Sequence, residues 1–148
     1  MNITEETAVL VREEIARRLA EFPDLVGVSC IARGADSVFA QAVLDGDGRL
    51  EVVLPSLNYR EAKVKPGHAP VFDELIARAS EVRVMDFEDA GREAYEAANE
   101  ALLRSADRLV AVWDGEGGEA GGTGSVVKLA RERGVAVDMV WPEGAARA

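Results

Sequence analysis

Six glycines and two hydroxyl side chains gather between Asp114 and Ser125, a composition suited to binding a phosphate group. Glycine lets the backbone approach an anion closely, so that exposed N–H groups point at it, and hydroxyls add further donors. A flexible surface loop is the alternative, but a position between an apolar run and a helical pattern favours phosphate binding. The residues of this segment assigned to the predicted site are Asp114, Gly115, Gly121, Gly122, Thr123, Gly124 and Ser125.

A second candidate turn contains Arg33, Gly34 and Asp36, and it also follows an apolar run and opens a helix. Arg33 is the cation best placed to bind a phosphate with two parallel hydrogen bonds. Asp36 either caps the helix, with Gly34 permitting the turn, or contacts the ligand, and the two roles are compatible.

Two further residues join the predicted nucleotide-binding set. Tyr59 follows a strand, where it would either stack on a ligand or be solvated in a loop, and Asn99 lies on the inward side of a helix. A buried amide needs a partner, so Asn99 either ties its helix to a neighbouring loop or contacts the ligand. Spacing assigns no catalytic residue among the acidic candidates Asp36, Asp114, Glu116 and Glu119. His68 has no partner at metal-ligand spacing, so we expect no metal site, and nothing predicts a cofactor.

The pattern of apolar residues predicts elements that alternate along the chain and would hold these turns. Strands are expected at 25–32, 50–54, 81–85, 108–113 and 135–140. Helices are expected at 4–22, 37–44, 71–79, 91–105 and 123–133, with a loop at 56–67 and a frayed tail at 143–148. This order predicts an α/β fold, a Rossmann-like three-layer sandwich with a mostly parallel sheet of about four or five strands. We expect one domain, 1–148.

Charge and hydropathy narrow the class of partner. The chain has 148 residues and a net charge of −10, which repels polyanions and argues against a nucleic-acid partner. No apolar run approaches the roughly 20 residues of a membrane helix, and the first residues lack a signal-peptide pattern. The lone Cys30 excludes an internal disulfide and is expected to be a buried, inert thiol. We therefore expect a cytoplasmic protein with a small nucleotide-type ligand and no membrane partner, and a homo-oligomer is left open.

Taken together, the motifs resemble the SLOG superfamily, the Rossmann-like proteins that include the LOG phosphoribohydrolases and the DprA-type proteins. The likeness runs through residues 29–36, 50–55 with Tyr59, 99–115 and 121–124. It implies binding of a nucleotide or a nucleotide derivative and, in some branches, cleavage of an N-glycosidic bond.

Two departures from that resemblance matter. The LOG enzymes carry a pro-gly-gly-x-gly-thr-x-x-glu motif, and in that phase this chain has Ala120, Ser125 and Lys128 in place of the proline, threonine and active-site glutamate. Such proteins also open with a central strand, whereas this sequence begins at the following helix. Either the true start lies upstream, or the two flanking strands pair directly, or a partner chain fills the gap, and of these we expect a misplaced or shortened start.

Binding needs only the loops, so the sequence favours a nucleotide-binding sensor or signalling module. The alternative is an enzyme that cleaves or transfers at the N-glycosidic bond, an activity that the Ala-Asp and Asp-Gly turns also suggest by likeness to nucleoside deoxyribosyltransferases. A degenerate scaffold or interaction subunit is the second alternative.

Overall fold

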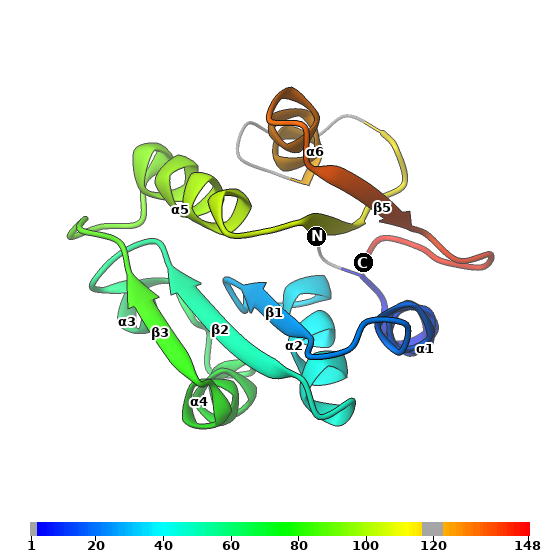
Figure 1. Cartoon of the computed structure of the whole chain (residues 1–148). Coiled ribbons are helices and arrows are strands. Elements are labelled where there is room, and N and C mark those ends of the chain that lie inside the picture. Colours follow the sequence, from blue (N-terminus) through cyan, green and yellow to red (C-terminus); the bar gives the residue numbers. More distant parts are fainter. Residues whose placement is uncertain (1–2, 117–122) are drawn as a thin grey trace.

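The computed structural model describes residues 3–116 and 123–148, which form alternating helices and parallel strands (Figure 1). The strands are β1 (Val26–Ser29), β2 (Arg49–Leu54), β3 (Glu81–Val84), β4 (Arg108–Val112) and β5 (Ala136–Val140). The helices are α1 (Glu5–Leu19), α2 (Ala35–Asp45), α3 (Tyr59–Lys63), α4 (Ala69–Arg78), α5 (Arg92–Arg104) and α6 (Thr123–Glu132). No helix among the described residues is long and apolar enough to cross a membrane.

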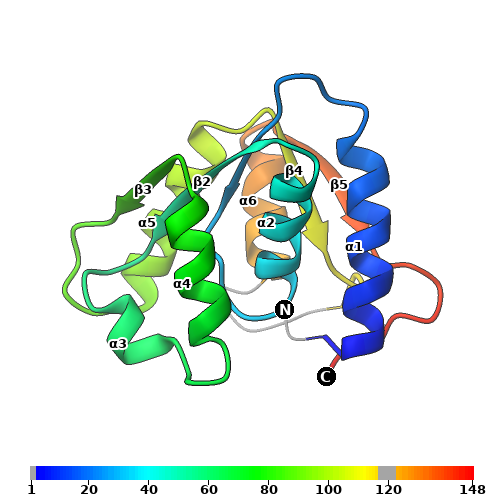
Figure 2. The same ribbon diagram turned by 90° about the horizontal axis from the view of Figure 1, so that it is seen from below.

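Helices cover both faces of the strands, which gives three layers. Alternate residues of β2 face opposite sides: Leu50, Val52 and Leu54 pack with α4, and Val53 packs with α5. Figure 2 shows α4, α2 and α1 side by side across one face, and α5 and α6 lie on the other face in Figure 1. The expected Rossmann-like α/β fold with parallel strands is confirmed.

The strands form two separate sheets. One has the order β1-β2-β3 and the other is the pair β4-β5, and all pairings are parallel. Among the described residues no strand is hydrogen-bonded to both β1 and β4, and these two do not pair with each other. The expected alternative of direct pairing between the flanking strands is therefore wrong for the described part of the chain.

Side-chain packing joins the two sheets. One buried cluster combines Val11 and Ile15 of α1 with Val43 of α2, Val112 of β4 and Val140 of β5. Helix α1 begins as expected, because Thr4 caps it by accepting a hydrogen bond from the Thr7 N–H at 3.1 Å. The cluster packs α1 and α2 against the two-stranded sheet, and α2 also packs against the three-stranded sheet, where Gly27 of β1 lies against Val43.

Three local expectations are wrong. The helix expected to reach residue 22 ends at Leu19, which leaves Phe22 39% exposed beyond it. The loop expected at 56–67 contains the five-residue helix α3, which is too short to show helical periodicity in the sequence and is tied to α4 by the ion pair Arg60–Asp73 at 2.9 Å. The strand expected at 25–32 spans Val26–Ser29, and Ile31, two residues beyond it, has a left-handed φ of +47°.

Candidate functional site

The two candidate turns lie at the same edge of the fold. The β1–α2 turn and the β4–α6 loop both follow the carboxyl ends of parallel strands, and Ala35 at the start of α2 shares a buried cluster with Val112 at the end of β4. In Figure 1 β1 and β4 are the facing strands of the two sheets, so that β2 and β3 lie on one side of them and β5 on the other. Ligands of open α/β proteins bind outside the carboxyl ends of the strands, where the strand order reverses.

The β1–α2 turn has a strained backbone. Ile31 has φ +47° although it is β-branched and fully buried, and a β-branched residue rarely adopts this left-handed conformation. The N–H of Ile31 donates to Ser29 Oγ at 2.9 Å, and the Ser29 hydroxyl donates to the Asp36 carbonyl at 3.3 Å. Such strain persists only where surrounding contacts hold it, and it is frequent at binding sites.

His68 and Ser37 hold the same turn from two helices. His68 precedes α4, and its Nε2–H donates to the Ile31 carbonyl at 3.1 Å and approaches Ser37 Oγ at 3.3 Å. The Ser37 hydroxyl donates to the Ala32 carbonyl at 2.8 Å. The turn is therefore fixed by side chains from β1, α2 and the start of α4.

At the tip of this turn a cation lies next to a glycine. Gly34 has φ +90°, a conformation that favours glycine, and it is the residue that precedes α2. Arg33 is exposed, and no described residue forms an ion pair or a hydrogen bond with its side chain. The expectation that Gly34 permits the turn is confirmed, but Asp36 is inside the first helical turn and makes no capping hydrogen bond.

Asp36 belongs to a group of titratable side chains at the carboxyl end of β1. Burial raises the pKa of Asp36, and burial together with the Asp36 charge raises the pKa of the Cys30 thiol far above its usual range. Burial likewise raises the pKa of the Tyr59 hydroxyl, with contributions from Tyr95, Cys30 and Asp36. Cys30 and Tyr59 are consequently neutral near pH 7, as expected for an inert thiol, although Cys30 is half-buried and not fully buried as expected.

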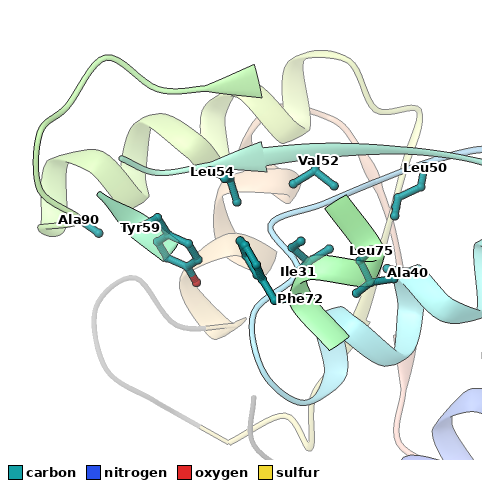
Figure 3. Close-up of a cluster of buried hydrophobic side chains, with 9 residues drawn as sticks. All are labelled: Ile31, Ala40, Leu50, Val52, Leu54, Tyr59, Phe72, Leu75 and Ala90. Atoms are coloured by element: carbon teal, nitrogen blue, oxygen red, sulfur yellow. The ribbon is translucent and has the colours of Figure 1, made fainter. Parts of the chain in front are cut away.

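Tyr59 is a core residue as well as a site candidate. It begins α3, is 6% exposed, and its ring lies 6.2 Å from that of Phe72 between centroids. In Figure 3 the hydroxyl oxygen is at the end of the ring that points away from β2. The ring is thus already packed, and the hydroxyl is the group of Tyr59 best suited to meet a ligand.

Asn99 is half-buried in the middle of α5. Its side chain makes no hydrogen bond with any residue in the described ranges. The structural tie to a loop that the sequence suggested is therefore not seen in the described part of the chain, and the ligand-binding role stays a prediction.

The described part of the β4–α6 loop is held by its own side chains and by the tail. Asp114 accepts two hydrogen bonds from Arg147, at 2.7 and 2.8 Å, and one from the Glu116 N–H at 3.0 Å. The Arg147 guanidinium accordingly lowers the pKa of Asp114. Trp113 Nε1–H donates to the Glu116 carbonyl at 2.6 Å, across Gly115 with φ +85°.

The tail after β5 is docked rather than frayed. The Ala146 N–H donates to Thr7 Oγ1 at 2.8 Å, and Ile3 and Arg147 form an antiparallel bridge. The expectation of a frayed tail is wrong because Arg147 finds its partner Asp114 33 residues away in the sequence.

The glycine-rich segment is described only in part. Gly121, Gly122 and Glu119 lie outside the described residues. Thr123 begins α6, Ser125 lies in its first turn, and Gly124 faces the Trp113 ring, where an added Cβ would lie 3.2 Å from the nearest ring carbon. A side chain at position 124 would therefore require the Trp113 ring to move by a few tenths of an ångström.

A hollow of about 800 Å³ lies at the opposite edge of the strands. It is bordered by Leu19 and Phe22 near the end of α1 and by Asp47 and Arg49 before and at the start of β2. It is remote from both turns and at the amino ends of the strands, so we do not assign the site there.

Comparison with known proteins supports the fold. No protein-family model and no curated protein matches the sequence. A solved structure of DNA processing protein A (DprA) from Streptococcus pneumoniae aligns with a TM-score of 0.66 and 17% identity, covering 95% of this chain and 47% of that protein. A structure of (E)-4-hydroxy-3-methyl-but-2-enyl diphosphate reductase aligns over 97% of this chain and 58% of that one, at 14% identity and a TM-score of 0.28, which is too low to indicate a shared fold. The chain therefore has a DprA-like Rossmann fold and spans about half the length of that relative.

Sequence reasoning missed several residues of this edge. His68, Ser37 and Ser29 fix the first turn, Arg147 holds Asp114, and Tyr95 is near Cys30 and Tyr59. Only Ser29 and Ser37 carried a local signal, as polar residues beside an apolar strand end. The other three reach the site from distant positions in the sequence.

Proposed function

We propose that this chain binds a nucleotide or a nucleotide derivative at the carboxyl ends of β1 and β4, as a sensor or signalling module. The observation that carries the proposal is Arg33, an exposed guanidinium without an ion-pair partner among the described residues, at a Gly34 turn that opens α2. A guanidinium and the N–H groups of a helix start both bind phosphate oxygens, and they do so whatever the net charge of the protein.

The rigidity of the turn supports this proposal. Ser29, Ser37 and His68 hold the backbone around Ile31 in place before any ligand arrives. A preorganised site avoids part of the entropy loss of binding, which raises affinity. The likeness to DprA supports the same placement only through the fold, because at 17% identity it carries no residue-level information.

The test is a thermal-shift panel of AMP, ATP, NAD and ADP-ribose at millimolar concentration. A ligand at about 100 times its Kd stabilises the native state by about 2.7 kcal/mol, which is readily detected as a rise in Tm. Arg33→Ala should reduce the shift, whereas Arg104→Ala, which removes another exposed arginine without an ion pair among the described residues, should leave it unchanged. No shift with any of the four compounds would contradict the proposal and favour a scaffold.

Cleavage at the N-glycosidic bond is the second candidate, and Asp36 favours it. Burial raises the pKa of Asp36, so this carboxyl holds its proton to higher pH than an exposed one and is suited to protonate a departing base. We expect the protein to release free base from the nucleotide that shifts the Tm, and chromatography measures this release. Asp36→Asn should abolish that release and retain the shift; release that continues in Asp36→Asn would exclude Asp36 as the acid.

A further inference from the structure

Strand β3 is an open edge of the three-stranded sheet. It pairs with β2 along one side, and no described strand pairs with its other side. All four residues of β3 are exposed, including Val82 and Val84 at 40% each. An edge of this kind presents unpaired N–H and C=O groups that are able to pair with another strand.

The two faces of β3 differ in chemistry. Val82 and Val84 lie beside Val52 and Leu54, on the face covered by α4. Glu81 and Arg83 lie on the other face, where Glu81 is directly beside Glu51 of β2. Neither these two glutamates nor Arg83 forms an ion pair with a described residue.

Two-fold symmetry restricts how β3 can pair with a second copy of itself. In an antiparallel pair, two facing residues either both direct their N–H and C=O groups at the partner strand or both direct them away from it. Because this direction alternates along a strand, the two-fold axis between identical strands must lie between two copies of the same residue. An axis at Glu81 places two glutamates opposite each other, and an axis at Arg83 places two arginines opposite each other. An axis at Val82 places Glu81 opposite the partner's Arg83 twice, which gives two opposite-charge pairs.

We propose that two copies of this chain associate through β3, antiparallel about a two-fold axis at Val82. The two three-stranded sheets then form one continuous six-stranded sheet. The partner's Arg83 neutralises Glu81, which offsets the repulsion between Glu81 and Glu51. The two Val82 side chains face each other on the opposite face, where they lose their exposure to water.

The outer edge of β5 lacks this complementarity. Its charged residue, Asp138, is the middle residue of the strand and is already paired with Arg108 at 2.9 Å. An axis at that position would place Asp138 opposite itself. Self-association is therefore expected through β3 and not through β5.

Sedimentation velocity of the full chain over about 1 to 500 µM tests the proposal, because a dimer with a Kd in the micromolar range changes its degree of dissociation over these concentrations. We expect a concentration-dependent monomer–dimer equilibrium. Glu81→Arg and Arg83→Glu should each raise the Kd at least about tenfold, because each replaces two attractive pairs by two repulsive ones. Lys128→Glu, an equal change of charge on the exposed surface of α6, should leave the Kd unchanged.

Mixing the two variants gives the sharpest outcome. In a mixed pair both arginines of Glu81→Arg face both glutamates of Arg83→Glu, so an equimolar mixture should recover the association that each variant loses alone. Circular dichroism of each variant confirms that the fold is retained. The proposal is overturned if the wild type stays monomeric throughout, if the single reversals do not weaken association, or if the mixture does not recover it.

Discussion

Removal of the Ser29 hydroxyl tests the strained turn most directly. Ser29→Ala deletes the acceptor of the Ile31 N–H at 2.9 Å and the donor to the Asp36 carbonyl at 3.3 Å. Ser29 is 5% exposed and Ile31 is fully buried, so water does not easily replace the lost partner of the amide. The backbone of Ile31 would keep its unfavourable φ of +47° with one of its restraints removed.

The expected cost follows from that geometry. A buried N–H left without a partner costs about 1–3 kcal/mol, more than the net value of an ordinary hydrogen bond. A loss near 2 kcal/mol lowers the Tm by about 4–8 °C in a chain of this size. Ser80→Ala is the matched control, because the Leu50 carbonyl that loses the Ser80 hydroxyl keeps the Ser80 N–H at 2.8 Å.

Urea unfolding at 25 °C, followed by the fluorescence of Trp113 and Trp141, measures both free energies of unfolding. We expect Ser29→Ala to be destabilised by at least about 1 kcal/mol more than Ser80→Ala, with an unchanged m-value. Equal destabilisation of the two variants would refute the inference that Ser29 holds the turn against strain.

Three further outcomes follow from the structure. The pKa of Asp36 is raised in the folded protein, so the stability of the protein falls as pH rises from the unfolded pKa of 3.8 through the folded pKa. Asp36→Asn should therefore be more stable than the wild type at pH 7 in urea titrations, and this advantage should vanish below pH 3.8. The pKa of Asp114 is lowered by Arg147, so its stabilising effect is lost as pH falls through that depressed pKa, and Arg147→Ala should return the NMR-measured pKa of Asp114 toward 3.8; an unchanged value would exclude the pair in solution. A methyl group on Gly27 would lie 2.5 Å from Val43 Cγ2, so Gly27→Ala should cost about 1–3 kcal/mol by calorimetry, and in the double mutant with Val43→Ala the costs should be less than additive.

The sequence was most informative where burial dictates residue type. The largely apolar run 108–113 predicted β4 to within one residue, although the strand begins at the exposed Arg108 and is fully buried only at Ala111 and Val112. Strand β3 was also expected, although its residues are exposed and its signal is weak. The short helix α3 was missed because five residues complete little more than one helical turn and leave no periodicity to detect.

The sequence predicted the turns of the candidate site but not the side chains that hydrogen-bond to them. Gly34 immediately precedes α2 and Asp114 closely follows β4, and the local pattern reveals both boundaries. The hydrogen bond of His68 with Ile31 spans 37 residues, and no local pattern encodes such a contact. The pairing of Arg147 with Asp114 was likewise invisible, because tail composition alone suggested fraying.

The separation between β1 and β4 has a mechanical consequence. Backbone hydrogen bonds fix the distance and register between strands, whereas apolar packing such as that of Val11 and Ile15 with Val112 and Val140 tolerates small sliding movements. A ligand that touched both the β1–α2 turn and the β4–α6 loop would bridge the two sheets, and we expect its binding to fix their relative position.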